Sequence, residues 1–428
     1  MVYQTKICII GAGPGGVTAA LQLAKLGIEC IVADKATFPR DKICGDGLSG
    51  KVAAILDKID PSIIKKFQQQ PYKNNSFGII FTSPNRRSVP IPFSLNYKNN
   101  LHNPRGFVSR RFDFDHFLAN ELRLQPKITF LENTNIVSHT LTKEGYILND
   151  ETGNIEIKAQ LLIVANGAHS RFAKVTGGIK MEPQHHIAGI RAYYKNVKGL
   201  NEDGFIELHF LKKVLPGYFW IFPLPGGAAN VGLGVHSSIL QHKKINLRKL
   251  LLEIIDTDTE IKSRFSEASP DGNIDGYGLP LGSKKRKLYG NRYLLIGDAA
   301  SLIDPLTGEG IGNAMYSGFY AANVAENAVK NNDFSEQFLQ QYNKDIDRVL
   351  GPELKMSTTL QKLATRPWLF NLLMNKTAKS AELRNLLTAM FAEIDLFKKL
   401  FNSTFRICSG CHCHCLACNI HFIGHFYF

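Results

Sequence analysis

The feature that most constrains how this chain folds is a glycine-rich turn between two apolar runs near its N-terminus. Residues 6–10 form a short apolar run typical of a buried parallel strand, and they lead directly into Gly11. The turn contains the pattern GxGxxG, and apolar residues then recur at helical spacing until Gly27. A second apolar run, 28–33, ends on Asp34. This order of strand, turn, helix, strand and terminal carboxylate predicts a dinucleotide-binding unit of an α/β fold.

The residues of this turn have separate physical roles. Gly11 permits the tight turn, Gly13 lets the backbone approach a pyrophosphate, and Gly16 lets the helix pack close to the strand. The helix N-terminus offers free N–H groups and the positive end of its dipole to the phosphates. Asp34 is expected to accept hydrogen bonds from the adenosine ribose. At this point the cofactor is either NAD or FAD, and its predicted contacts are Gly11, Gly13, Pro14, Gly15, Gly16, Asp34 and Lys35.

Length and composition indicate an ordinary globular protein of more than one structural unit. The chain has 428 residues, of which 44% are hydrophobic and 21% charged. No apolar run approaches the roughly 20 residues that cross a bilayer, and the early first strand leaves little room for a secretory signal. We therefore expect a cytoplasmic protein, with peripheral contact at the inner face of the membrane as an open alternative.

The net charge of +14 admits two interpretations. It is either a solvated basic surface or a surface attracted to anionic lipid headgroups or to a phosphorylated substrate. Nucleic acid is not an expected partner, because no basic stripe interleaved with aromatic residues accompanies the charge.

The cysteines do not form a disulfide framework. Cys8, Cys30 and Cys44 lie in the nucleotide-binding region, and the other five crowd into 403–428 together with several histidines. That tail is interpreted as an altered or non-native C-terminus, with adventitious metal binding as the alternative, and no functional metal is assigned. Cys44 is either a small buried hydrophobe or a thiol that faces the cofactor or the substrate.

The remaining pattern predicts a second, β-rich unit and a helical C-terminal region. Alternating apolar and polar residues with bulky aromatics predict antiparallel strands from His185 to His236. Further strands are expected at 128–132, 135–141, 145–149, 155–158, 161–165 and 291–296. Helices are expected at about 50–59, 111–124 and 313–330 and throughout 335–400. The apolar stretches in the last of these are interpreted as packing, with a lid or a membrane-facing patch as the alternative.

These patterns divide the chain into an α/β, Rossmann-type cofactor domain, an inserted antiparallel substrate domain and a helical C-terminal region. The cofactor domain is expected to consist of 1–75, 106–180 and 286–330. The substrate domain is expected to consist of an excursion at 76–105 and of 181–285. The helical region is placed at 331–402 and the tail at 403–428.

Three separated motifs together resemble the FAD-binding set of the p-hydroxybenzoate hydroxylase-like flavoproteins. They are the N-terminal GAGPGG with its strand-end acid, the turn Asn166–Gly167, and GDAASLIDPLTGEGIG at 297–312. The resemblance implies that Asp298 hydrogen-bonds the ribityl chain and that 305–311 presents backbone N–H groups to the pyrimidine end of the flavin. It selects FAD as the cofactor, and its further contacts would be Arg111, Gly167, Gly297, Asp298, Pro305, Gly308, Gly310 and Ile311. A salt bridge from Arg111 to Asp115 is the alternative role for that arginine.

A narrower resemblance is to the geranylgeranyl reductase family. Residues 218–223 reproduce its YxWxFP motif, 232–234 its downstream GxG, and 42–47 resemble its cysteine–glycine loop near the flavin. It implies that Tyr218, Trp220 and Phe222 line an apolar substrate tunnel and that Cys44 and Gly45 lie beside the flavin. Cys44 becomes the candidate catalytic residue, to place the alkene or to relay a proton.

This chain departs from the two patterns at identifiable positions. Asp46 stands where the family commonly has glycine, and Asn166 stands where Asp is usual in the middle motif. Ala173 replaces the last arginine of that middle motif, which has been associated with nicotinamide use in hydroxylases. The electron donor is therefore left open between NADPH and a reduced carrier protein.

The predicted function is that of an FAD-dependent oxidoreductase that reduces carbon–carbon double bonds of an isoprenoid or related lipid. The expected partner is a small apolar or prenyl-lipid substrate. One alternative is a flavin-dependent monooxygenase or halogenase of an aromatic or apolar substrate. A second alternative is an electron-transfer or redox-sensing flavoprotein.

Overall fold

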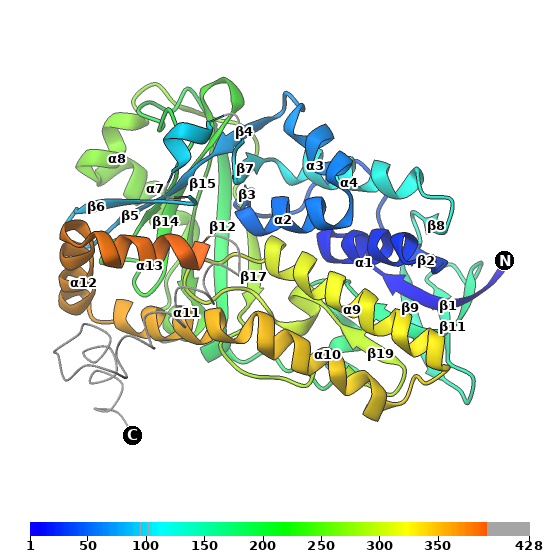
Figure 1. Ribbon diagram of the computed structural model, residues 1–428. Helices are drawn as coiled ribbons and strands as arrows, with labels where there is room; N and C mark the ends of the chain where they lie inside the picture. The colour runs from blue at the N-terminus through cyan, green and yellow to red at the C-terminus, as the bar shows by residue number, and fades with distance from the viewer. Residues whose placement is uncertain (95, 102, 392–428) are drawn as a thin grey trace, which may run out of the picture.

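The computed structural model describes residues 1–94, 96–101 and 103–391 (Figure 1). The predicted Cys/His-rich tail and the last part of the predicted helical region lie outside the described residues. The described part has two large sheets and a series of C-terminal helices, so the predicted fold class is confirmed.

The first large sheet is built on the N-terminal strand, which lies at its centre. Its order is β18 (Tyr289–Gly290), β19 (Tyr293–Leu295), β11 (Glu156–Val164), β1 (Val2–Ile10), β2 (Cys30–Ala33) and β8 (Ile128–Leu131). Within this order, neighbouring strands from β19 to β8 are parallel, and β18 is antiparallel to β19. The antiparallel strands β10 (Tyr146–Asp150) and β9 (Ile136–Leu141) extend the sheet from the first half of β11.

Strand β11 is a correction to the sequence analysis, which expected two strands at 155–158 and 161–165. The structure has one continuous strand of nine residues. Its first half alternates between buried and accessible side chains, whereas its last four residues are all buried. Opposite β1, the neighbour of β11 is β10 along its first half and β19 along its second half.

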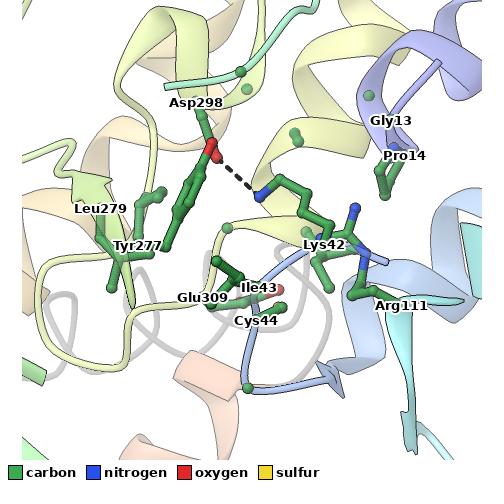
Figure 2. Close-up of a pocket in the computed structure, with 18 of the residues that line it drawn as sticks. Gly13, Pro14, Lys42, Ile43, Cys44, Arg111, Tyr277, Leu279, Asp298 and Glu309 are labelled. Atoms are coloured by element: carbon green, nitrogen blue, oxygen red, sulfur yellow. Dashed lines mark ion pairs between the residues drawn. The ribbon is translucent and has the colours of Figure 1, made fainter. Parts of the chain in front are cut away.

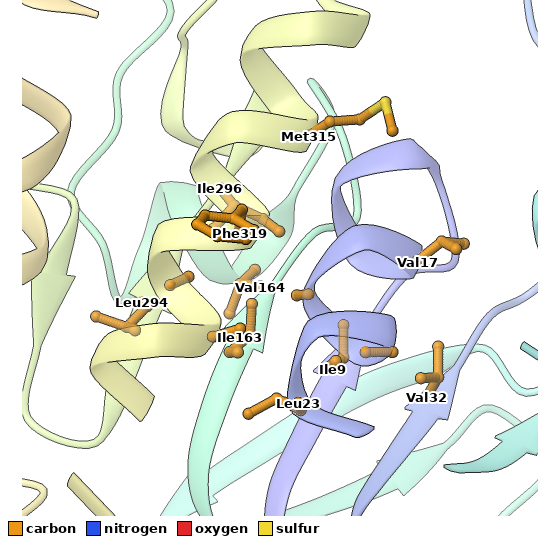
Figure 3. Packing of buried hydrophobic residues seen from close by; sticks show 14 of the residues in the cluster. Ile9, Val17, Leu23, Val32, Ile163, Val164, Leu294, Ile296, Met315 and Phe319 are labelled. Atoms are coloured by element: carbon orange, nitrogen blue, oxygen red, sulfur yellow. The ribbon is translucent and has the colours of Figure 1, made fainter. Parts of the chain in front are cut away.

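Two helices that are far apart in the sequence pack against each other over this sheet. Helix α1 (Pro14–Lys25) lies beside α9 (Ile311–Asn331), with Met315 and Phe319 of α9 turned toward the core (Figure 3). A Cβ atom on Gly318 would lie 2.2 Å from the carbonyl oxygen of Gly15, so glycine at this position permits the close approach. The approach joins the N-terminal turn to the 297–312 motif.

The second large sheet carries the predicted substrate strands. Its order is β16 (Ser269–Pro270), β12 (His186–Lys195), β15 (Ala228–His236), β14 (Tyr218–Leu224), β13 (Ile206–His209), β5 (Gly78–Thr82) and β6 (Ser88–Pro92). Strand β17 (Asp275–Pro280) pairs with β12. Neighbouring strands are antiparallel except β13 and β5. The predicted excursion at 76–105 thus supplies two strands of this sheet, although the domain boundaries themselves stay a prediction.

A small sheet and the helices complete the fold. The small sheet has the order β3 (Gly47–Leu48), β7 (Gly106–Ser109) and β4 (Lys73–Ser76). The other helices are α2 (Gly50–Ile59), α3 (Pro61–Gln68), α4 (Arg111–Arg123), α5 (Arg171–Val175), α6 (Ser237–Lys243), α7 (Leu247–Thr257), α8 (Thr259–Arg264), α10 (Glu336–Val349), α11 (Gly351–Ala364), α12 (Pro367–Lys379) and α13 (Ala381–Phe391). Short 3₁₀ turns lie at Tyr97–Asn100, Pro183–His185, Pro225–Gly227 and Gly297–Ala300. Helices α12 and α13 lie against β6 at the end of the second sheet, and α11 leads from α10 to α12 (Figure 1).

Candidate cofactor and substrate site

The predicted site residues converge on one cavity of about 700 Å³ (Figure 2). Its wall contains every residue predicted for the cofactor or the substrate except Gly16 and Pro305. Gly16 lies behind the turn, where a Cβ atom would lie 1.9 Å from the carbonyl oxygen of Gly11. The carbonyl of Pro305 accepts a hydrogen bond of 2.6 Å from Gln361 of α11. Both residues therefore support the wall rather than form it.

The N-terminus of α1 forms one end of the cavity. Its N-cap Gly13 makes no side-chain capping bond, and the first turn of the helix carries no acidic residue. Nothing lies within 4 Å of the position that a Cβ on Gly13 would take, so the backbone is open at this point. Free N–H groups and a positive dipole end facing an open space suit a pyrophosphate. This geometry fits the ADP part of FAD.

Asp34 stabilises the glycine turn itself. One carboxylate oxygen accepts a 2.6 Å hydrogen bond from the backbone N–H of Ala12, and the other accepts one of 2.8 Å from Ala36. A carboxylate has about four acceptor positions, so further hydrogen bonds can still be accepted. The contact of Asp34 with a ribose stays a prediction, while its role in shaping the turn was not anticipated.

Lys42 is a site residue that the sequence analysis did not assign. Its ammonium nitrogen lies 3.6 Å from the carboxylate of Asp298 and 4.4 Å from the centre of the Tyr277 ring (Figure 2). The ion pair joins the 42–47 loop to the Gly297–Asp298 turn across the cavity. Its position in the cysteine–glycine loop was the only sequence signal that could have indicated this role.

Arg111 makes the salt bridge to Asp115 that was considered for it, and its contact with the cofactor stays a prediction. Its guanidinium lines the cavity and also donates two hydrogen bonds of 2.6 Å to Asp115, four residues further along α4. Burial acts to lower the pKa of Arg111, but Asp115 and the neighbouring Cys44 side chain raise that pKa above its usual range. Arg111 is therefore a fixed cation beside Cys44.

Cys44 differs from the other cysteines of the described residues. Cys8 and Cys30 are buried in the first sheet, and burial raises the pKa of Cys30 to about 12. Cys44 is only partly buried and lies in the cavity wall. It is thus the free cysteine that a ligand in the cavity can contact.

The aromatic motif forms an apolar wall opposite the glycine turns. Tyr218, Trp220 and Phe222 face the cavity, as the alternation of a strand predicts. Phe219 and Ile221 point to the other face of the sheet and pack in a separate core. The Tyr218 hydroxyl donates a hydrogen bond to the carbonyl of Thr307. This bond ties the wall to the loop that precedes Gly308.

Asp46 is the centre of a buried network that was not predicted. Its carboxylate accepts hydrogen bonds from the Asn230 amide at 2.8 Å and from the Tyr193 hydroxyl at 2.7 Å. Asn230 also donates to the carbonyl of Cys44 at 2.8 Å and accepts from the Trp220 indole at 2.9 Å. Burial raises the pKa of Asp46 to about 6, against the opposing effect of the Asn230 and Tyr193 bonds. We call these residues, Asp46, Tyr193, Trp220 and Asn230, the Asp46 network.

The loop that contains Asp46 is pressed against the aromatic wall. Cβ atoms on Gly45 and Gly47 would each lie 3.1 Å from the ring of Phe222, so small residues are needed there. Asp46 itself has a φ of 68°, in the left-handed region that favours glycine. Its three hydrogen-bond partners, which include the backbone N–H of Arg111 at 3.3 Å, offset that strain.

A second buried cluster lies at the other end of the Gly308–Gly310 loop. The Lys51 ammonium nitrogen is 2.7 Å from Glu353, 3.4 Å from Glu309 and 2.8 Å from the amide oxygen of Asn313. Burial acts to lower the pKa of Lys51, but the two glutamates raise it above its usual range. Burial raises the pKa of Glu353 to about 7 despite the nearby Lys51. We call Lys51, Glu309, Asn313 and Glu353 the Lys51 cluster.

Two family models and several named relatives match this chain. A model described as an FAD binding domain matches residues 4–210, and one described as a geranylgeranyl reductase catalytic domain matches residues 187–267. The chain is 32% identical over 364 residues to digeranylgeranylglycerophospholipid reductase 2 of Methanosphaera stadtmanae, covering 83% of this chain and 86% of the relative. It is 29% identical over 333 residues to menaquinone reductase of Mycolicibacterium smegmatis, covering 76% and 77%.

A solved structure shares the fold. It is a geranylgeranyl bacteriochlorophyll reductase-like protein from Thermoplasma acidophilum, with a TM-score of 0.76 at 24% sequence identity. The match covers 94% of this chain and 100% of the other.

Proposed function

Since the chain belongs to the geranylgeranyl reductase family of FAD-dependent oxidoreductases, we propose that it reduces carbon–carbon double bonds in the prenyl chain of a membrane lipid. Its cofactor is FAD. The relatives are named for reduction of a digeranylgeranylglycerophospholipid and of menaquinone. A prenyl chain attached to a polar head is common to both substrates, and this chain is proposed to act on a lipid of that class.

The observation that supports the proposal best is the position of the apolar wall relative to the cofactor loops. Tyr218, Trp220 and Phe222 line the same cavity as the glycine turns, and Phe222 packs directly on Gly45 and Gly47. An alkene has no charge and no hydrogen-bond donor, so an aromatic and aliphatic surface is the complementary environment.

The residues of the chain divide the work of binding and protonation. The α1 N-terminus with Gly13 and Gly15 would hold the pyrophosphate, and Asp298 with its partner Lys42 would hold the ribityl chain. Reduced FAD, when bound, supplies the hydride that one alkene carbon accepts. The other carbon requires a proton, and Cys44 is the proposed group that places the alkene or relays that proton. Arg111 fixes the thiol from one side.

Partners other than the lipid follow from the same proposal. The electron donor is NADPH or a reduced carrier protein, and the cavity alone favours neither. Among the described residues, no helix is both long and apolar enough to cross a bilayer. We propose that the C-terminal helical region makes peripheral contact with the membrane that holds the lipid substrate.

An anaerobic assay tests the function. Purified protein, photoreduced with its FAD, is mixed with a polyunsaturated prenyl glycerophospholipid or a prenylated quinone, and the lipid is analysed by mass spectrometry. We expect each reduced double bond to add two hydrogens to the prenyl chain and to reoxidise one flavin. Cys44→Ser should bind FAD normally and slow this step, while Cys8→Ser serves as the control because Cys8 is buried in the sheet.

Two other outcomes would contradict the proposal. Oxygen uptake stimulated by an aromatic substrate, with no lipid reduction, would favour the monooxygenase or halogenase alternative. Flavin that exchanges electrons with a carrier protein but never saturates a lipid would favour the electron-transfer alternative.

A further inference from the structure

Helix α12 presents two large apolar side chains to solvent. Trp368 is 66% exposed and Leu372 is 45% exposed, and their spacing of four residues places them on one face of the helix. The opposite face is buried through Phe370 and Met374. The helix is thus amphipathic, with apolar residues that are not all used for internal packing.

The charged residues of α12 and of the segment before it have one sign. Residues 354–381 contain no aspartate or glutamate. They contain five lysines and arginines, and all of these side chains are exposed: Lys355, Lys362, Arg366, Lys376 and Lys379. Lys376 and Lys379 lie in the last turn of α12, and the exposed Glu382 at the start of α13 is the first acidic residue after them. An exposed tryptophan and leucine on a helix whose own charged residues are all cations is the composition of a helix that lies in the interface of an anionic bilayer.

The buried face of α12 leads toward the cavity. The ring of Phe370 lies 4.7 Å from that of Phe210, and the ring of Phe210 lies 5.6 Å from that of Tyr218. Phe370 and Met374 belong to the same apolar core as Tyr218, Trp220 and Phe222. Two rings therefore separate the helix from the proposed substrate wall, and the helix lies at the edge of the molecule away from α1 (Figure 1).

We propose that the exposed face of α12, with Trp368 and Leu372 as its apolar anchors, docks on an anionic lipid bilayer. The surrounding lysines and arginines meet the anionic headgroups, and the apolar core behind the helix is brought against the membrane that holds the lipid substrate. The biological purpose rests on the proposed function, whereas the docking itself does not. A second copy of the chain is a poorer occupant, because the cationic face would meet an identical cationic face.

The chain carries its own probe for this contact. It contains two tryptophans, and Trp220 is buried, so Trp220→Phe leaves Trp368 as the reporter. The full chain with FAD is titrated with vesicles of pure phosphatidylcholine and with mixed phosphatidylcholine–phosphatidylglycerol vesicles that carry brominated acyl chains. We expect blue-shifted Trp368 emission and bromine quenching only with the anionic vesicles, and reversal of both at high salt.

Sedimentation with the same vesicles measures the affinity. Trp368→Ser with Leu372→Ser should abolish binding, and Lys376→Ala with Lys379→Ala should weaken it by roughly fivefold for each cation removed. The apolar control is Leu124→Ser with Leu252→Ser, because Leu124 is 65% exposed at the C-cap of α4 and Leu252 is 42% exposed on α7. The charge control is Lys243→Ala with Lys244→Ala at the end of α6. Both controls should bind as the unmodified chain does.

Three results would overturn the docking. The first is equal affinity of the Trp368→Ser, Leu372→Ser variant and its control. The second is Trp368 emission that is already blue-shifted before any vesicle is added and that the brominated vesicles do not quench, which would mean that residues 392–428 cover the helix. The third is dimerisation lost in the same variant. Reduction of a short, detergent-free prenyl alcohol separates the two proposals: its absence contradicts the function, while its persistence without vesicle binding contradicts only the docking.

Discussion

Two buried polar sets of residues flank the cavity, and each satisfies its central charged group in a different way. The Asp46 network satisfies one carboxylate with uncharged donors from an amide, a phenol and a backbone N–H. The Lys51 cluster instead holds one ammonium group between two carboxylates. The first joins the cysteine loop to three strands of the second sheet, and the second joins α2 to α9 and α11.

The difference indicates how each set of residues holds its part of the cavity wall in place. A network of neutral donors fixes directions, because each hydrogen bond has a preferred geometry, and losing one donor removes no charge from the network. An ion cluster in the interior is held by attraction that must offset the desolvation of every member. The Asp46 network therefore fixes the orientation of the cysteine loop, whereas the Lys51 cluster holds α11 to α2 and α9 by charge attraction.

The largest expected effect on stability comes from removing the cation of the Lys51 cluster. Lys51→Met leaves Glu309 and Glu353 without their cation, and removal of one partner from a buried ion pair costs about 3–5 kcal/mol. Urea denaturation at pH 9, above the pKa of about 7 of Glu353, measures the free energy of unfolding. Because Glu353→Gln removes one of the stranded charges, Lys51→Met combined with it should recover part of the loss. A double variant no better than Lys51→Met alone would show that the cluster is not electrostatically coupled.

The next largest effect comes from removing the amide that holds the cysteine loop in the Asp46 network. Asn230→Ala removes hydrogen bonds to Trp220, Cys44 and Asp46, and each buried group left unsatisfied costs about 1–3 kcal/mol. We expect FAD to stay bound, because Asn230 contacts the loop and not the glycine turn. The rate of lipid reduction should fall more than the affinity for the lipid, as single-turnover stopped-flow measurements can separate. Asn230→Gln, which keeps the amide one methylene further away, tests whether position matters.

The contrast between local and distant partners also explains how far the sequence could be interpreted. The βαβ unit and the one-sided placement of Tyr218, Trp220 and Phe222 follow from periodicities within a few residues, so they were predicted. Lys51 and Glu353 are 302 residues apart, and a pair of polar residues at such a distance has no periodic signature. Neither cluster could be inferred from local patterns.

Asp46 is an intermediate case. A signal was present, since an aspartate stood where the resembling family commonly has glycine. Its left-handed φ of 68° shows that the backbone conformation of a glycine is kept, while the side chain adds a carboxylate. What it binds depends on Tyr193 and Asn230, which lie 147 and 184 residues away, and could not be read from the loop alone.

The two buried acids, Asp46 and Glu353, also predict different pH dependences of the free energy of unfolding. Burial raises the pKa of Asp46 from 3.8 to about 6 and that of Glu353 from 4.5 to about 7. An acid with a raised pKa in the folded state is more favourable when protonated, so its contribution is present at low pH and is lost as pH rises through the folded pKa. Asp46→Asn should flatten the stability curve between about pH 4 and 6. Glu353→Gln should flatten it between about pH 4.5 and 7. Identical curves for the two variants would contradict separate environments.

The smallest effect separates the donors within the Asp46 network. Tyr193→Phe removes one hydrogen bond and leaves the carboxylate with its Asn230 and Arg111 partners, so the cost is that of a single bond, about 0.5–1.5 kcal/mol. The same loss should raise the pKa of Asp46, because the Tyr193 bond acts to lower it. Thermal unfolding and the pH profile of lipid reduction check both parts. Tyr193 contacts the cysteine loop only through the Asp46 carboxylate, whereas Asn230 also binds the carbonyl of Cys44. A fall in the reduction rate as large as that of Asn230→Ala would therefore mean that the carboxylate, and not the amide, sets the position of Cys44.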